Sequence, residues 1–417
     1  MSTPCSIGRA ARRAAGLLCA AALAGCAGGQ VTGPDFTPPP PPVAASVFVV
    51  TTDFQTGSYA TFPLGAPEQI RGNLGRIHSD AVALEHDGLV YVINRLGGDS
   101  IQALDPQQGF KSLWECSVGN GSNPHDLIFA APDKAYVTLY ESRQLLIVDP
   151  SVGASCAGFV RGSIDLGVLA DADGIPEMDS GAILDGRLFV TLERLDRNAF
   201  FAPSDYSAIA VIDVASDTLL DADPSTAALD GIRLAGTNPF TGGQGLMTDA
   251  DGFIVVGDVG SFGVIGDGGI ERVDPQTLQS AGYLISEDEL GGNLTDFVLV
   301  GPHEGYGIVT DLAFHNLLVR FDPTERRVLA VLLSSDEYLV DLALEPTRGE
   351  LYLTDRTLKR PGIRIFRTGD GVELTTAPID TGLPPFEVVF LPAPDGVAAV
   401  ADAGHAAATA SRGDHAR

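Results

Sequence analysis

The sequence lacks most of the motifs that mark common enzymes and nucleic-acid-binding proteins. It contains no Cys-x-x-Cys pair, no His-Glu-x-x-His motif, no Gly-x-Ser-x-Gly elbow and no Walker loop. A recognisable zinc site, a serine hydrolase elbow and a nucleotide-binding loop are therefore not indicated. Basic residues are also scarce, because 26 Lys and Arg stand against 54 Asp and Glu, a net charge of -28. Nucleic acid and anionic membrane surfaces are poor partners for such a chain.

Cysteine is scarce as well, with five in 417 residues. Cys5 and Cys19 fall in a segment that reads as an export signal, and Cys26 ends that segment. Cys116 and Cys156 remain, and two cysteines in an oxidising compartment are a candidate disulfide. A bonded pair and two free thiols both stay open at this point.

Residues 1–25 read as a bacterial export signal, with a charged region that contains Arg12 and Arg13 and a short apolar stretch at 14–24. That stretch is too short for a membrane span. Leu-Ala-Gly-Cys at 23–26 resembles the lipobox of bacterial lipoproteins, in which cleavage leaves the cysteine, here Cys26, as the first residue with the lipid attached. The resemblance implies a membrane anchor, and Ala27 implies sorting to the outer membrane of a Gram-negative cell. An ordinary secretory signal with an incidental cysteine is the alternative.

A repeated phrase dominates the rest of the chain. An apolar strand that ends in Asp or Asp-Pro recurs at residues 100–106, 144–150, 208–213, 269–275 and 317–323. A unit that recurs at roughly 45 residues cannot bury its faces alone, so its copies must stack. A four-stranded unit of this period predicts an all-β fold, a β-propeller.

Counting inner strands predicts seven four-stranded blades. The middle copies are longer, which places insertions at 196–206, 217–230 and 257–268. The inner strands are expected to start near Asp80, Asp126, Asp179, Gly245, Asp296, Asp341 and Glu387.

The two ends of the chain are predicted to share one blade. The last inner strand, at 386–391, lacks a full set of followers, whereas the segments at 47–50 and 58–63 lack an inner strand of their own. Joining them closes the ring and hides the sheet edges. A strand at 396–401 would compete with 47–50, whose bulkier alternation is favoured.

This pattern divides the chain into four parts. Residues 1–25 are the lipoprotein signal, and 26–45 are the lipidated cysteine with a proline-rich tether, which is either an extended or a disordered spacer. Residues 46–397 form the propeller. Residues 398–417 are small, polar and unpatterned, and are predicted as a disordered tail.

Segments of the second unit resemble the YVTN-type repeats of bacterial surface and periplasmic seven-bladed propellers, a group that includes YncE-like proteins. The likeness rests on Pro124-His-Asp-Leu-Ile-Phe, Lys134-Ala-Tyr-Val-Thr and Gln144-Leu-Leu-Ile-Val-Asp-Pro. Other copies depart from it, with Tyr-Val-Ile-Asn at 91–94 and Tyr-Leu-Thr-Asp at 352–355. The resemblance implies a fold and a cell-envelope address, but little about activity.

Six of the seven inner strands are predicted to open on an acidic residue. Because inner strands line the channel of a propeller, these carboxylates could form a ring that gathers a cation such as calcium. The alternative is structural, with each carboxylate accepting backbone N–H groups of the adjoining blade. The channel-mouth candidates are Asp80, Asp126, Asp179, Asp296, Asp341, Glu387 and His125.

A second metal candidate is the loop at 171–179. Asp171, Asp173, Glu177 and Asp179 offer hard oxygen donors at close spacing. The loop lacks the order of an EF-hand, so a solvated acidic loop is the alternative to a calcium site. No other cofactor is indicated.

Two classes of function follow. The leading hypothesis is a lipid-anchored binding or scaffold protein with a monomeric head that faces the periplasm or the cell surface and contacts an unidentified protein or glycan. The alternative is a metal-dependent hydrolase that resembles propeller lactonases. In that case Asp126, Asp296, Asp341 and Asn293 would hold a divalent ion that polarises an ester carbonyl.

Overall fold

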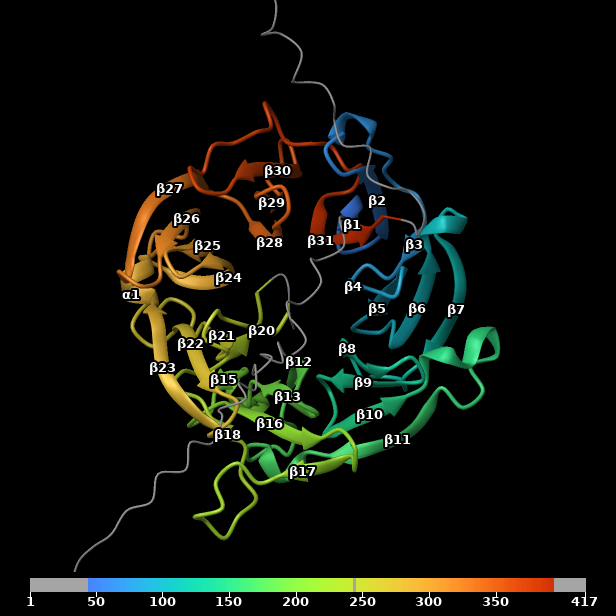
Figure 1. Ribbon diagram of the computed structural model, residues 1–417, viewed down its shortest axis with the longest axis vertical. Coiled ribbons are helices and arrows are strands. Elements are labelled where there is room, and N and C mark those ends of the chain that lie inside the picture. Colours follow the sequence, from blue (N-terminus) through green and yellow to red (C-terminus); the bar gives the residue numbers. More distant parts are fainter. Residues whose placement is uncertain (1–43, 243–244, 394–417) are drawn as a thin grey trace, which may run out of the picture. The chain divides into compact units, whose positions relative to one another are not determined.

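The computed structural model describes residues 44–242 and 245–393 as a ring of small sheets around a central axis (Figure 1). Seven antiparallel sheets of three to five strands follow one another, together with a separate two-stranded hairpin. The predicted all-β, seven-bladed β-propeller is therefore confirmed. The helices of these residues are short, and none is long and apolar enough to cross a membrane. The predicted signal, most of the tether, the tail and the competing strand at 396–401 lie outside the described residues.

The first three blades are formed by consecutive segments of the chain. Blade 1 contains β4 (Ala81–His86), β5 (Leu89–Asn94), β6 (Ser100–Asp105) and β7 (Lys111–Ser117). Blade 2 contains β8 (Pro124–Ala131), β9 (Lys134–Leu139), β10 (Gln144–Val148) and β11 (Val160–Asp165). Blade 3 contains β12 (Met178–Leu184), β13 (Arg187–Leu192), β16 (Ala208–Asp213), β17 (Thr218–Leu220) and β18 (Ile232–Arg233).

The next three blades continue around the ring. Blade 4 contains β19 (Pro239–Phe240), β20 (Met247–Thr248), β21 (Ile254–Asp258), β22 (Gly269–Asp274) and β23 (Gln279–Ser286), followed by α1 (Glu287–Leu290). Blade 5 contains β24 (Asn293–Gly301), β25 (Glu304–Thr310), β26 (Asn316–Asp322) and β27 (Arg327–Ser335). Blade 6 contains β28 (Leu339–Glu345), β29 (Glu350–Asp355) and β30 (Gly362–Arg367).

Blade 7 joins the two ends of the chain, as the sequence predicts. Its strand order is β31 (Pro385–Pro392), β1 (Ala44–Thr52), β2 (Gly57–Pro63) and β3 (Arg76–Ile77). The register sets Val49 opposite Val388. Successive residues of β1 point to opposite faces of the sheet. Val47 and Val49 therefore pack toward blade 6, whereas Phe48 packs toward blade 1.

The inner strand of blade 4 departs from the predicted single strand near Gly245. It is broken into β19 and β20, which both pair with β21. The break falls in a glycine-rich segment where the backbone comes very close to blade 5. A Cβ atom at Gly242 would lie 2.0 Å from the carbonyl oxygen of Phe297. A side chain at this position would therefore force blades 4 and 5 apart.

The three predicted insertions are connections between strands. The first contains the hairpin of β14 (Leu195–Asp196) and β15 (Ala202–Pro203), between β13 and β16. The second follows β17, and the third joins β21 to β22. The longer repeats thus keep the blade order and add length at the surface.

Cys116 and Cys156 are joined by a disulfide with a Cα–Cα distance of 5.5 Å. Cys116 lies on β7 of blade 1, and Cys156 follows the 3₁₀ segment Pro150–Ser155 before β11 of blade 2. The bond therefore ties together the outer parts of two neighbouring blades.

Replacing Val49 with Asp should lower the free energy of unfolding by about 4 kcal/mol or more. Val49 is fully buried in β1, so a carboxylate there would lie in the core of the closing blade. Urea unfolding followed by circular dichroism measures the loss. Val331→Asp is the matched control, because Val331 is 55% exposed on β27. Equal losses in the two variants would contradict a closing role for β1.

Candidate functional site

A cavity of about 650 Å³ lies among the inner strands of the ring. Its lining comes from all seven blades, and it includes every predicted channel-mouth candidate except Asp80. The titratable side chains in the lining are Glu85, Arg95, His125, Asp126, Asp179, Asp296, Asp341 and Glu387.

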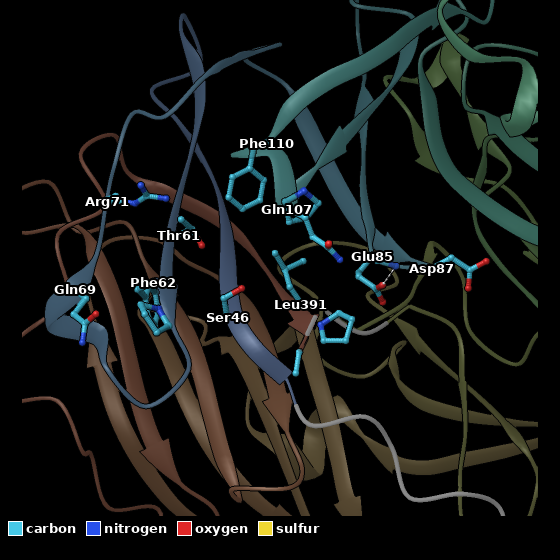
Figure 2. Close-up of a pocket in the computed structure, with 15 residues that line it drawn as sticks. Ser46, Thr61, Phe62, Gln69, Arg71, Glu85, Asp87, Gln107, Phe110 and Leu391 are labelled. Carbon is cyan, nitrogen blue, oxygen red and sulfur yellow. Dashed lines mark hydrogen bonds between the residues drawn. The ribbon is translucent and has the colours of Figure 1, made fainter. Parts of the chain in front are cut away.

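A second hollow, of about 970 Å³, lies between blades 7 and 1 (Figure 2). Its lining includes Phe62, Phe110, Arg71 and Gln107, and none of the predicted site residues. The channel cavity is therefore the better candidate site.

Four of the channel carboxylates each join one blade to the next. An oxygen of each side chain accepts a hydrogen bond from a backbone N–H of the following blade. This is the structural role that is the alternative to a metal ring. The acceptor and donor pairs are Asp126 with Gly181 at 2.9 Å, Asp296 with Leu342 at 2.5 Å, Asp341 with Val388 at 3.0 Å and Glu387 with Ala83 at 2.6 Å.

Asp179 does not occupy the position that the predicted ring assigns to it. The backbone N–H of Asp126 donates to the Thr138 hydroxyl, and in blade 3 the N–H of Ser180 donates to the Thr191 hydroxyl in the same way. Ser180 is therefore the counterpart of Asp126. β8 and β12 have the same shift in register at this point, so Asp179 takes the position of His125, one residue before the bridging position.

Asp80 also departs from the predicted ring. It precedes β4 and does not line the cavity. Its Oδ1 accepts hydrogen bonds from Arg95 Nε at 3.1 Å and Arg95 Nη2 at 2.5 Å. Asp80 thus holds Arg95, which does line the cavity. The repeated carboxylate bridge is absent from Asp80 and Asp179, and the channel loses its symmetry there.

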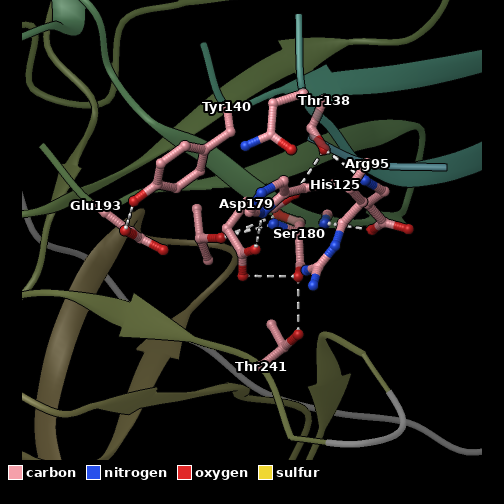
Figure 3. Close-up of polar contacts among 12 residues, drawn as sticks. Arg95, His125, Thr138, Tyr140, Asp179, Ser180, Glu193 and Thr241 are labelled. Carbon is pink, nitrogen blue, oxygen red and sulfur yellow. Dashed lines mark hydrogen bonds and ion pairs between the residues drawn. The ribbon is translucent and has the colours of Figure 1, made fainter. Parts of the chain in front are cut away.

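The asymmetric part of the lining contains a chain of polar contacts (Figure 3). His125 Nδ1 lies 2.9 Å from Asp179 Oδ1. The Ser180 hydroxyl donates to Asp179 Oδ2 at 2.9 Å, and the Thr241 hydroxyl donates to Ser180 Oγ at 3.0 Å. Thr241 belongs to the segment that breaks the inner strand of blade 4, so that break brings a third blade into the contact.

Tyr140 contacts the His125 ring, and Glu193 in turn contacts Tyr140. The His125 and Tyr140 rings stack with centroids 4.4 Å apart, and the Tyr140 hydroxyl donates to Glu193 Oε2 at 2.6 Å. We call Arg95, His125, Tyr140, Asp179, Ser180, Glu193 and Thr241 the polar sector.

Five members of the polar sector were not predicted from the sequence. A positional signal exists for three of them. Arg95, Tyr140 and Glu193 each directly follow the second strand of their blade. A comparison of the units at that position would have shown three large polar residues in three consecutive blades.

Burial shifts the protonation of the bridging carboxylates. It raises the pKa of Asp126 to about 6 and that of Glu387 to about 8. The pKa of Asp341 lies well above its usual value because of burial and the neighbouring charges of Asp296 and Glu387. These three buried acids have no ion-pair partner in the described part of the chain. Their protonated forms are therefore favoured relative to carboxylates in water.

The two acids of the polar sector behave differently. Burial acts to raise the pKa of Asp179, but the hydrogen bond and charge of His125 lower it below its usual value. Burial raises the pKa of Glu193 well above its usual value, and the charge of Asp179 adds to that effect. The ionised form of Asp179 is thus favoured beside His125, whereas burial favours the protonated form of Glu193.

The acidic loop at 171–179 is built around Arg197. Arg197 Nε lies 2.8 Å from Glu177 Oε1, and the backbone N–H of Arg197 donates to Asp173 Oδ2 at 3.1 Å. Asp171 accepts the N–H of Asp173. An arginine and backbone N–H groups thus face the carboxylates of this loop, and Asp179 lies against His125.

No group of three or more His, Cys, Asp or Glu side chains in residues 44–242 and 245–393 is arranged to hold a metal ion. The ligand set considered for a hydrolase is also dispersed. Asn293 does not line the cavity, and its side chain bonds to Glu287 and to the carbonyl of Val264. It is therefore not brought together with Asp126 or Asp341.

Comparison with known proteins identifies the fold alone. No known family profile matches the chain, and no curated protein matches it. A protein from Lactobacillus plantarum is similar in structure, with 14% identity, a TM-score of 0.58, and coverage of 84% of this chain and 100% of that one. A putative 6-phosphogluconolactonase from Bacteroides fragilis is similar at 13% identity and a TM-score of 0.56, with coverage of 86% and 100%. Both are similar to this chain as propellers.

Glu387→Gln should remove a pH dependence of stability. Because the pKa of Glu387 is raised from 4.5 to about 8 on folding, its contribution is complete below pH 4.5 and is lost as the pH rises toward 8. Glutamine keeps an acceptor for the Ala83 N–H but cannot ionise. The wild type should therefore lose stability relative to this variant between about pH 5 and 8.

Urea unfolding at a series of pH values measures this difference. Glu325→Gln is the control, because Glu325 is exposed in the turn between β26 and β27. Parallel pH curves for the wild type and Glu387→Gln would contradict the assignment.

Proposed function

We propose that the protein is a lipid-anchored binding protein of the cell envelope whose central channel takes a small organic cation. The observation that carries this proposal is the charge of the cavity lining. Six acidic residues line one cavity together with one arginine and one histidine, although the carboxylate of one of them, Glu85, accepts the Gly88 N–H in the second hollow.

The two basic side chains of the lining are already compensated. Arg95 forms an ion pair with Asp80, and His125 lies against Asp179. Asp126, Asp341 and Glu387 are held by backbone N–H groups, which carry no net charge. A cation in the cavity would favour their ionised forms.

Aromatic side chains in the lining suit an organic cation. Phe240, Phe386 and Phe390 line the cavity beside the carboxylates. The face of an aromatic ring attracts an ammonium group, and the attraction strengthens where water is excluded. A primary amine or diamine combines the charge and the apolar surface that this lining would accept.

The hydrolase alternative receives less support. The His125–Asp179 pair faces the cavity and is the one feature that favours an enzyme, because an aspartate can orient a histidine base. The metal-dependent form of the idea requires Asp126, Asp296 and Asp341 as ligands. Their contacts join neighbouring blades. The similarity in fold to a putative 6-phosphogluconolactonase does not transfer its activity.

Cys26→Ser should prevent lipid attachment and release the protein from the membrane fraction. The support is the Leu-Ala-Gly-Cys sequence at 23–26, and a lipid-modified cysteine is what would hold such a head at a membrane. Radiolabelled palmitate and cell fractionation provide the measurement. Cys19→Ser is the control and should behave as the wild type. Continued labelling of Cys26→Ser would overturn the proposed anchor.

Calorimetric titration with putrescine and spermidine tests the channel proposal. Binding at pH 7 should release protons, because Glu387, whose pKa is about 8, must ionise to face the cation. Proton release is measured by repeating the titration in buffers of different ionisation enthalpy. Glu387→Gln should bind about tenfold more weakly and release fewer protons.

Neutral 1,4-butanediol is the ligand control, and Glu325→Gln is the protein control. Absence of heat with both amines would reject the proposal. Equal binding of the diol and the diamine would also reject it, since charge would then play no part.

A further inference from the structure

Six aromatic side chains are exposed on loops of the propeller. Their exposed fractions run from 48% for Phe201 to 97% for Phe200. Single exposed apolar residues are common, but a group of them on one face indicates an interaction site. We call this group the aromatic face, and its members are Phe54, Phe200, Phe201, Phe262, Phe314 and Tyr338.

The strand order places all six at the same end of the ring. Phe54 lies between β1 and β2, Phe314 lies between β25 and β26, and the other phenylalanines also lie between the second and third strands of a blade. Tyr338 lies in a link from one blade to the next. In an antiparallel blade both kinds of link lie at the end where the inner strand begins.

The strand registers support this placement. In blade 5 the start of the inner strand, Asn293, is opposite Thr310, and Thr310 is opposite Asn316. Phe314 therefore lies at the end where the inner strand starts. Asp126 and Glu387 are near the starts of their own inner strands. The aromatic face thus lies at the channel mouth that contains the bridging carboxylates, and its members come from blades 3, 4, 5 and 7 and from the link between blades 5 and 6.

Phe54 connects the aromatic face to the channel lining. Its ring meets Phe386 edge to face, with centroids 6.1 Å apart, and Phe386 lines the cavity. The guanidinium of Arg356 lies 4.6 Å from the centroid of Phe54 and 5.9 Å from that of Phe386. Aromatic rings and arginine together are typical of the centres of protein interfaces.

Backbone strain coincides with exposure at four of these residues. Phe54, Phe200, Phe201 and Phe314 have φ angles of 64°, 59°, 59° and 65°. This left-handed region favours glycine or asparagine and costs a bulky residue about 1 to 2 kcal/mol. Since these side chains are exposed, burial within the chain does little to offset the cost. Strain of this kind is typical of functional surfaces.

The charge around the aromatic face decides between partners. Asp53 adjoins Phe54, and the side chains of Asp205 and Asp336, 72% and 89% exposed, lie in the loops of Phe200 and Tyr338. The whole chain carries a net charge of -28. A second copy of this chain and an anionic membrane would both be repelled. A basic surface would be attracted.

The described start of the chain lies at the other end of blade 7 from the aromatic face. Ala44, the first residue of β1, is opposite Pro392, the last residue of β31. The aromatic end is marked by Thr51 opposite Pro385, at the other end of this pair. The chain therefore enters blade 7 on the face opposite to the aromatic face.

We propose that the aromatic face docks a protein partner whose surface is basic and partly apolar. Phe200 and Phe314 are its main anchors. Both side chains are exposed and both have a strained backbone, and contacts within the chain do little to offset that strain. This inference is independent of the ligand in the channel.

Site-specific photocrosslinking in intact cells that make the full-length protein tests this docking surface. The photoreactive residue p-benzoylphenylalanine replaces Phe200 or Phe314, and in the controls it replaces Val160 or Val331, which are exposed on the outer strands β11 and β27. Both test positions should give an adduct with the same protein, identified by mass spectrometry, and the control positions should not.

The identified partner is then purified and titrated. Phe200→Ser combined with Phe314→Ser should weaken its binding at least about tenfold, and added salt should weaken it further. Val160→Ser combined with Val331→Ser should leave binding unchanged.

The proposal is overturned by a lipid or glycan adduct, by an adduct with another copy of this chain, by equal adducts at the control positions, or by none. A partner that binds the double phenylalanine variant as tightly as the wild type also overturns it. Amine binding in the channel should be the same in that variant, which separates this proposal from the proposed function.

Discussion

The pairing of β31 with β1 is the constraint on which the rest of the structure depends. Each blade of a propeller packs its two faces against its neighbours, so an open ring would expose two apolar faces. In this chain the last inner strand completes the sheet that the first described strands begin. The alternation of β1 supplies Val47 and Val49 to one neighbour and Phe48 to the other. Closure therefore brings all seven inner strands to one axis, and the cavity exists because of it.

The carboxylates at the channel show how a structural device and a binding site can use the same atoms. One oxygen of Asp126 accepts the N–H of Gly181 in the next blade, and Glu387 makes the equivalent contact with Ala83. A carboxylate has more acceptor positions than one such bond uses. The same side chain can therefore hold two blades together and face the cavity. The raised pKa values of Asp126 and Glu387 follow from that double placement, since burial is the main cause of both.

The polar sector and the aromatic face have a common origin in the loops that depart from the repeat. Thr241 reaches Ser180 because the inner strand of blade 4 is broken between β19 and β20. Phe200 lies in the long connection that also contains Arg197, around which the acidic loop at 171–179 is arranged. The repeat thus builds the ring, and the departures from it build the features that distinguish this propeller.

The sequence by itself determined the number of blades, the closure by both ends and the location of the insertions. These depend on period and on alternation within a strand, which are local properties. Only the tertiary structure decided which side chains meet at the channel. Asp179 takes the position of His125, one residue before the bridging position that Ser180 occupies, and Asp80 turned to Arg95. Such contacts depend on which residue of each inner strand faces the next blade, and the spacing of acidic residues along the chain does not reveal that register.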